Sequence, residues 1–264
     1  MMTSPLAAGL TLVPRRHMNR LITEWRAAGP VISQVILSGV TVGPEWSWLP
    51  PSARESGTGL VLIELPSGGR VAVAPPFPVV AAGDDGLAGL ESLLTARQAV
   101  GIVLLRLGRY AVGVAVDEIL SAPKSGHRYV HGRHKAGGQS QHRYEHNREN
   151  WMSELFDEVC AEAAPRFRAA GLIASGAQAR APAAVRNQHW LALGGDRLVL
   201  GSFLDHCTEL QKMRGQLLPW RVPVERPGSD ALRRAVTLIW AYRVYSEGPL
   251  GREPAPLPFR DRGP

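Results

Sequence analysis

The sequence predicts an α/β protein with a small N-terminal α/β unit and a second unit built on a mixed sheet. Three observations lead to this fold class. Short β-branched and apolar runs alternate with segments of helical periodicity. A stretch rich in glycine, proline and aspartate interrupts the pattern near residue 85. A long amphipathic segment then follows a glycine–glutamine loop in the second half of the chain, and it predicts a long helix.

Length and composition exclude several classes of protein. The chain has 264 residues, enough for one large or two small cores, and 45% hydrophobic content excludes a largely disordered chain. Its apolar runs are too short for a transmembrane helix, and its N-terminus lacks the pattern of a signal peptide. Two cysteines, Cys160 and Cys207, cannot form a disulfide framework or a cysteine-rich zinc site. We therefore expect a cytoplasmic protein with reduced thiols.

The first unit is expected over residues 1–85. A helix is predicted at 17–28, because apolar residues from Met18 to Trp25 recur at helical spacing before the stop signal Gly29-Pro30. Strands are predicted where apolar and β-branched residues run together, at 10–13, 31–42, 59–65 and 70–74. The last two flank Pro66-Ser67-Gly68-Gly69, which is a hairpin signal.

The second unit is expected over residues 86–247. It begins with a helix at 87–98 and a hairpin of strands at 100–105 and 110–119, followed by a basic loop from 121 to 140. Ser140 is suited to cap the long helix, predicted from about 141 to 170. The apolar stripe of that helix is Tyr144, Trp151, Leu155, Phe156, Val159 and Ala163.

The remaining elements follow from shorter patterns. Strands are predicted at 172–174, 190–193, 198–200 and 220–224, and helices at 205–213 and 229–245. Residues 248–264 are rich in proline and arginine, so we expect a disordered tail.

The positive charge is concentrated in one segment. The net charge is +7, and six basic against two acidic residues between Pro123 and Trp151 give that segment +4. Five of the eight histidines lie there too. A solvated basic loop and a contact with a phosphate backbone both account for this density.

The loop Gly137-Gly138-Gln139 lies inside this basic segment, between a predicted hairpin and the long helix. Adjacent glycines let a backbone approach a ligand closely. A glutamine beside them offers an amide and a backbone N–H that need no ionisation. These groups suit a reaction that places water against an ester and stabilises an oxyanion, although Gly-Gly-Gln also occurs in ordinary turns.

The longer run R-Y-V-H-G-R-H-K-A-G-G-Q-S-Q, residues 128–141, is more specific. It resembles the bacterial, chiefly actinobacterial, release-factor-like peptidyl-tRNA hydrolases. These are related to the eukaryotic ankyrin-and-zinc-finger peptidyl-tRNA hydrolases of ribosome quality control and, more distantly, to the catalytic domain of archaeal and eukaryotic class I release factors. The resemblance is strongest over residues 100–170 and implies a release-factor-like catalytic domain. The chain lacks the zinc-finger, ankyrin and coiled-coil segments of the eukaryotic relatives.

The resemblance implies hydrolysis of peptidyl-tRNA on stalled large ribosomal subunits. The family pattern Gly-x-x-Gln falls on Gly138–Gln141 and makes Gln141 the catalytic glutamine, whereas the release-factor pattern Gly-Gly-Gln falls on Gly137–Gln139. We favour Gln141 and keep Gln139 as the alternative, with Gly137 and Gly138 shaping the tip. The residues expected to bind RNA are Arg128, His131, Arg133, His134, Lys135 and Arg143.

The expected partners are the large ribosomal subunit, through its rRNA, and peptidyl-tRNA, with no membrane contact. We expect a monomer and no cofactor. No metal is expected either, because the glycines around the clustered histidines favour a loop. Cys160 is predicted as a core residue. Two other functions stay open: an endonuclease that cuts tRNA near its 3′ end, and a non-catalytic ribosome or RNA binder.

Overall fold

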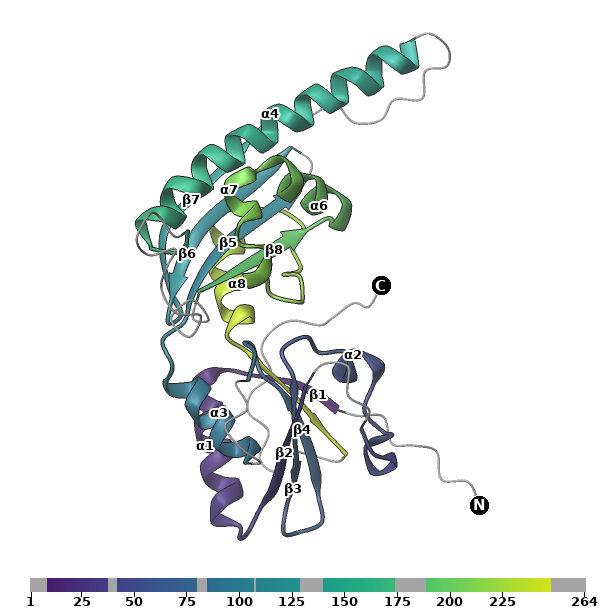
Figure 1. Cartoon of the computed structure of the whole chain (residues 1–264), viewed down its shortest axis with the longest axis vertical. Helices are drawn as coiled ribbons and strands as arrows, with labels where there is room; N and C mark the ends of the chain where they lie inside the picture. Colours follow the sequence, from purple (N-terminus) through teal and green to yellow (C-terminus); the bar gives the residue numbers. More distant parts are fainter. Residues whose placement is uncertain are drawn as a thin grey trace. The chain divides into compact units, whose positions relative to one another are not determined.

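The computed structural model describes residues 9–37, 42–79, 85–106, 108–128, 140–173 and 189–247, with the backbone alone for residues 140–149. Two sheets and their flanking helices form the described part of the chain (Figure 1), so the predicted mixed α/β class is confirmed. The chain divides into unit 1, residues 1–96 with 240–264, and unit 2, residues 97–239.

This division corrects the boundaries expected at 1–85 and 86–247. Helix α3 (Gly86–Thr95) buries Leu87 and Leu90 in the core of unit 1. Strand β9 (Tyr242–Ser246) pairs within the sheet of the same unit. Unit 2 is therefore inserted into unit 1. The sequence pattern does not reveal this, because the returning strand lies more than a hundred residues from its partners. The expected disordered tail lies outside the described residues.

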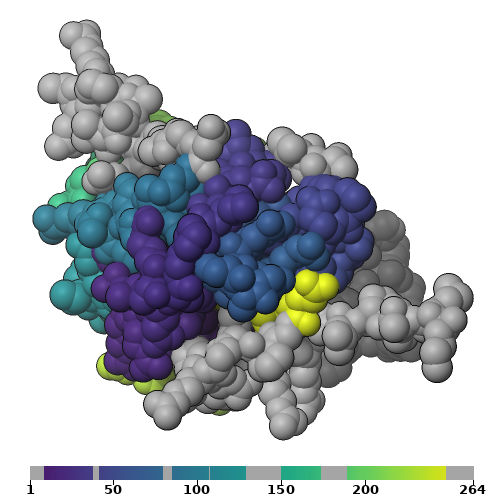
Figure 2. Space-filling view, turned by 90° about the horizontal axis from the view of Figure 1, so that it is seen from below, coloured from purple at the N-terminus to yellow at the C-terminus, as the bar shows by residue number. Residues whose placement is uncertain are grey.

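Unit 1 is built on a five-stranded antiparallel sheet in the order β1-β9-β4-β3-β2. Its other strands are β1 (Gly9–Val13), β2 (Ile32–Ile36), β3 (Leu60–Glu64) and β4 (Arg70–Ala74). In the space-filling view of Figure 2, the yellow residues of the β9 region adjoin the blue residues of this sheet. The four predicted strands of this unit are present, with β2 shorter than predicted.

Side chains alternate across this sheet and form a core on each face. Val61 and Ile63 face α1 (Arg15–Ala27) and α3, whereas Leu60 and Leu62 pack with Trp46. The second face is covered by the segment that contains a 3-10 helix, η1 (Pro44–Trp46), and α2 (Pro51–Arg54). The helix predicted at 17–28 is confirmed.

Unit 2 is built on a mixed sheet in the order β7-β6-β5-β8. Strands β5 (Ala99–Arg106), β6 (Arg109–Val116) and β7 (Ile119–His127) are antiparallel, and β8 (His189–Gly195) runs parallel to β5. Residues 121–127, expected in a loop, therefore lie in an edge strand. The turn before β7 contains Asp117 and Glu118, whose φ angles are 46° and 71°. Such a turn is usually signalled by Asn or Gly, and neither is present.

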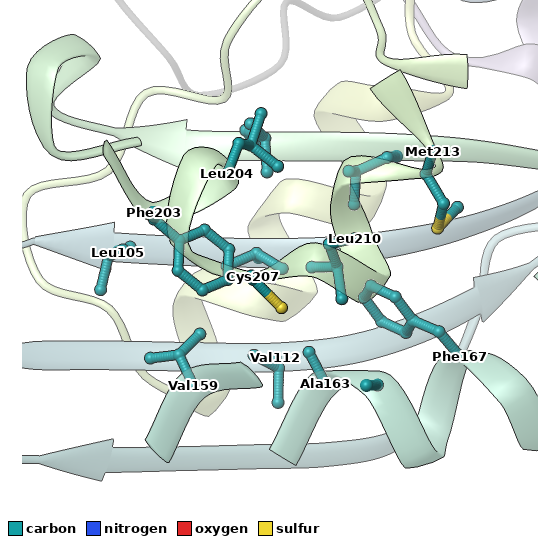
Figure 3. Packing of buried hydrophobic residues seen from close by; sticks show 14 of the residues in the cluster. Leu105, Val112, Val159, Ala163, Phe167, Phe203, Leu204, Cys207, Leu210 and Met213 are labelled. Carbon is teal, nitrogen blue, oxygen red and sulfur yellow. The ribbon is translucent and has the colours of Figure 1, made fainter. Parts of the chain in front are cut away.

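Helices cover both faces of the mixed sheet (Figure 1). Helices α4 (Ser140–Ala169), α6 (Arg197–His206) and α7 (Thr208–Gln211) share one core with the sheet, and α8 (Ser229–Ile239) packs on its other face. Figure 3 shows Phe203, Cys207 and Leu210 pointing toward the side that carries Val159 and Ala163 of α4. A short 3-10 helix, η3 (Arg214–Gln216), follows α7.

Several elements predicted after α4 are corrected. Residues 198–200 begin α6 instead of forming a strand, because the Asp196 carboxylate accepts from the N–H groups of Leu198 and Val199. The helix predicted at 229–245 ends at Ile239, because the following residues are taken up by β9. No strand covers Leu172–Ile173, and the strand expected at 220–224 is reduced to one bridge between Val222 and Gly194.

The two cysteines are joined in a disulfide, which corrects the expectation of reduced thiols. Cys160 lies on α4, and Cys207 directly follows α6, with 5.8 Å between their Cα atoms. Cys207 is 1% exposed and packs in the core of unit 2, with Cys160 partly buried against it. The predicted core position of Cys160 therefore holds, but its sulfur cross-links two helices.

Candidate functional site

The candidate site is the glycine–glutamine loop, and the structure describes its two stems. Arg128 is described in full. Gln141 and Arg143 lie in the first turn of α4, where the backbone is described. The other predicted site residues lie outside the described residues: His131, Arg133, His134, Lys135, Gly137, Gly138 and Gln139.

The first stem is the end of β7. His127 stands opposite Arg109 of β6, and the N–H of Arg128 donates to the carbonyl oxygen of Gly108 at 2.9 Å. The sheet therefore holds the chain in register as far as Arg128, the residue at which the specific sequence run begins.

The second stem is α4, which starts at Ser140, one residue earlier than predicted. Its predicted stripe is confirmed where side chains are described: Leu155, Phe156, Val159 and Ala163 are at most 5% exposed and Trp151 is half-buried, whereas the side chain of Tyr144 is not described. In Figure 1 the N-terminal part of α4 continues past the end of the sheet.

Three glutamates on α4 face the first stem. Glu154, Glu158 and Glu162 are spaced by four residues, so they form a row along one side of the helix. We call them the carboxylate row. Arg128 of the first stem lies 2.8 Å from Glu154 and 3.8 Å from Glu158, and Lys124 lies 3.5 Å from Glu162. The row therefore links β7 to α4 at two points, near the start of the loop and four residues before it.

Between these two links, Tyr110 of β6 reaches the middle of the row. Its hydroxyl donates to a carboxylate oxygen of Glu158 at 2.9 Å. Gly126 leaves the space for this ring, because a Cβ there would lie 2.4 Å from Cε1 of Tyr110. Burial and then the hydrogen bond to Glu158 raise the pKa of the Tyr110 phenol. The site thus needs glycine at 126 and a protonated tyrosine at 110.

These contacts give Arg128 a partner within the protein. The sequence predicts that Arg128 binds RNA, whereas the structure directs its guanidinium at two carboxylates, with the side chain 43% exposed. The carboxylate row and Tyr110 are absent from the sequence prediction. Their one visible signal is the four-residue spacing of the glutamates, which on a helix is common on solvated faces.

No group of three or more histidine, cysteine or acidic side chains among the described residues is arranged to hold a metal ion. No described helix is both long enough and apolar enough to cross a bilayer.

The chain is similar to known release factors. Residues 98–245 match the family model described as "Actinobacteria/chloroflexi VLRF1 release factor". The chain is also 28% identical over 154 residues to "Peptide chain release factor subunit 1" of Aeropyrum pernix. That match covers 56% of this chain and 36% of the archaeal protein, so the chain spans little more than a third of its length.

Two solved structures are similar at lower identity. The crystal structure of an archaeal translation termination factor, aRF1, has a TM-score of 0.38 and 18% identity, over 86% of this chain and 70% of that chain. A structure described as an archaeal protein has a TM-score of 0.33 and 17% identity, over 85% and 70%.

Proposed function

The chain belongs to the Actinobacteria/chloroflexi VLRF1 release factor family, and on that premise we propose that it is a peptidyl-tRNA hydrolase. The proposed reaction is hydrolysis of the ester between a nascent chain and its tRNA on stalled large ribosomal subunits. The observation that carries the proposal is the family match over residues 98–245, which includes both stems and the glycine–glutamine loop. Kinship with the ankyrin-and-zinc-finger hydrolases of ribosome quality control is part of this proposal.

The start of α4 supports Gln141 as the glutamine that acts on the ester. Gln141 is the second residue of the helix, and the first four N–H groups of a helix have no acceptor within it. The helix dipole also favours negative charge at this end. The backbone N–H of Gln141 is thus suited to stabilise the developing oxyanion, while its side-chain amide orients the attacking water. Gly137 and Gly138 let the tip approach RNA closely, and Gln139 remains the alternative.

The length of α4 supports a loop that works at a distance from the sheet. Glu154 is the residue of the carboxylate row nearest the N-terminus of α4, and Ser140 lies 14 residues before it. At 1.5 Å per residue, the helix extends about 21 Å beyond that contact. A helix that projects this far suits a reaction centre enclosed by RNA, because the tip of the helix can enter the centre while the rest of the protein stays outside it.

The proposed partners are rRNA of the large subunit and peptidyl-tRNA. His131, Arg133, His134, Lys135 and Arg143 supply donors to phosphates around the tip, and Arg128 contributes charge at the base. We propose a cytoplasmic monomer that needs no metal or cofactor, because an amide and backbone N–H groups suffice for this ester chemistry.

The test is incubation of the purified protein with large subunits that carry a labelled nascent chain on tRNA. Wild type should release the chain, Gln141→Ala should lose at least about 99% of the rate, and Gln139→Ala should lose less. An inactive Gln139→Ala beside an active Gln141→Ala assigns catalysis to Gln139. Full activity of both variants contradicts glutamine catalysis. Binding of wild type without release favours a non-catalytic ribosome binder.

The fate of the tRNA separates ester hydrolysis from endonuclease activity. Ester hydrolysis leaves tRNA with a complete 3′ CCA end, which accepts an amino acid again without repair. A nuclease leaves shortened tRNA, which is charged only after a nucleotidyltransferase rebuilds the end. Recharging of the recovered tRNA without repair is the expected result.

A further inference from the structure

Three basic side chains form one row across the end of the unit 2 sheet that carries the loop. Arg106 of β5 stands opposite Arg109 of β6, and Arg109 stands opposite His127 of β7. Neighbouring strands lie about 4.8 Å apart, so the row spans about 10 Å. All three side chains are exposed. We call these three residues the strand-end row.

The strand-end row points away from α4. The adjacent row of residues consists of Leu105, Tyr110 and Gly126, and Tyr110 reaches Glu158 on α4. Successive residues of a strand point to opposite faces. Arg106, Arg109 and His127 therefore lie on the face where α8 packs, and a guanidinium N–H of Arg106 donates to the carbonyl oxygen of Val224, in the segment that leads to α8, at 3.4 Å.

No carboxylate neutralises the strand-end row among the described residues. Directly opposed like charges on neighbouring strands are unfavourable. Elsewhere in this unit arginines meet acids, as in the pairs Arg128–Glu154, Arg168–Glu209 and Arg233–Asp230. The hydrogen bond from Arg106 to Val224 also ties the row to the segment that carries Arg226, an exposed residue two positions after Val224. Glu225 is the acidic residue of that segment, and among the described residues no ion pair joins it to the row.

We propose that Arg106, Arg109, His127 and Arg226 bind the phosphate backbone of RNA at the base of the glycine–glutamine loop. This inference rests on the proposed function, because it names RNA contacts of the same loop. His127 is the residue directly before Arg128, so a backbone bound here lies against the first stem, on the side opposite the carboxylate row. Several cations along one edge favour an anionic polymer over a single anion, and the planar guanidinium groups of arginine match phosphate geometry.

The sequence alone does not indicate this surface. Arg106, Arg109 and Arg226 lie outside the basic segment between Pro123 and Trp151 and are spread over 121 positions. Strand pairing and one hydrogen bond bring them together. These arginines lie on the body of unit 2, away from the tip of the loop, so they can bind RNA without taking part in the proposed reaction.

The experiment measures binding and release separately with the full chain. The test variant is Arg106→Gln/Arg109→Gln, and the charge-matched control is Arg197→Gln/Lys212→Gln, which removes two exposed cations elsewhere in unit 2. Affinity for large subunits carrying peptidyl-tRNA, and for the naked rRNA of that subunit, is measured across a salt series. The maximal single-turnover release rate is measured at saturating protein, and thermal unfolding verifies folding.

The test variant should bind both probes about tenfold more weakly near physiological salt, with a log–log salt slope about 1.4 to 1.8 shallower. Its maximal release rate and the binding of the control should stay within about twofold of wild type. Unchanged affinity and slope, or an equal loss in the control, overturn the phosphate-binding row. A loss on subunits without a loss on naked rRNA assigns the surface to a protein partner and also overturns it.

The same measurements distinguish the failure of this inference from failure of the proposed function. Wild type that binds both probes through the strand-end row but releases no peptide contradicts hydrolysis while supporting the row. If wild type releases peptide and the test variant binds both probes as well as wild type does, the result supports hydrolysis and contradicts RNA binding by the row.

Discussion

The phenol of Tyr110 donates a 2.9 Å hydrogen bond to the carboxylate of Glu158 and so joins the centre of the unit 2 sheet to α4. Tyr110 is 1% exposed, whereas Glu158 is partly exposed and also faces Arg128. The bond lies between the contacts Lys124–Glu162 and Arg128–Glu154. It therefore limits how far β6 and α4 can slide past each other below the loop.

Replacing Tyr110 with phenylalanine should lower the free energy of unfolding by about 1–2 kcal/mol, because a hydrogen bond to a charged group is lost while the ring is kept. Denaturant unfolding measures the change. In the Glu158→Ala background the same replacement should cost much less, because its acceptor is already gone. An equal cost in both backgrounds contradicts the coupling.

Stability above pH 10 should depend on the same phenol. Burial raises its folded-state pKa above the unfolded value of about 10, so the folded protein retains this proton more strongly. The contribution is present below pH 10 and declines as the pH rises above it. The stability difference between wild type and Tyr110→Phe should therefore shrink from pH 9 to pH 11 in denaturant unfolding. A constant difference over this range contradicts the prediction.

Gly126→Ala should destabilise the protein by about 1–3 kcal/mol, because the new methyl group overlaps the ring of Tyr110. Gly201→Ala is the matched control. It lies on α6 with no atom within 4 Å of a Cβ, so it should stabilise by about 0.5–1 kcal/mol. Thermal unfolding of both variants gives the comparison, and equal shifts would refute the steric account.

A charge exchange decides between the two roles of Arg128. Arg128→Glu places three carboxylates together and should impair peptide release, with an unfolding change of about 1 kcal/mol or less. If Arg128 acts by aligning the stems, Arg128→Glu/Glu154→Arg should restore most of the release rate. A double variant as impaired as the single one assigns Arg128 to RNA contact.

Reduction of the Cys160–Cys207 disulfide should destabilise unit 2. The bond closes a loop with a sequence separation of 47 residues, for which chain entropy gives about 4 kcal/mol. Thermal unfolding with and without a reductant measures the effect, and Cys160→Ser/Cys207→Ser should be insensitive to the reductant. A wild-type transition that does not respond to reduction contradicts the cross-link.

The sequence predicts the elements whose signals are local. The helix around Met18 and Trp25 and the buried stripe of α4 follow from apolar spacing, and the hairpin of β3 and β4 follows from Pro66 to Gly69. The sequence does not predict β7, because its turn, Asp117-Glu118, lacks glycine. Most side chains of β7 are also exposed, which removes the alternating pattern of a half-buried strand.

The candidate site divides in the same way. The loop and its glutamines can be found from a run of letters, because the motif is contiguous. The residues that hold the two stems of the loop cannot be found in this way, because Tyr110, Gly126 and Glu158 meet only through strand register and helix packing. The strand-end row cannot be predicted from the sequence either, because Arg106 and Arg109 are ordinary hairpin residues there and only the pairing of β7 with β6 adds His127 to them.

The position of β9 between β1 and β4 has a consequence for synthesis on the ribosome. Every strand of the unit 2 sheet leaves the exit tunnel before residue 242, so that unit can fold first. Until β9 emerges, the sheet of unit 1 has a gap, with two unpaired edges that invite pairing with other chains. A nascent chain from which residues up to 239 have emerged but β9 has not thus carries a folded unit 2 and an incomplete unit 1 sheet, which β9 completes when it emerges.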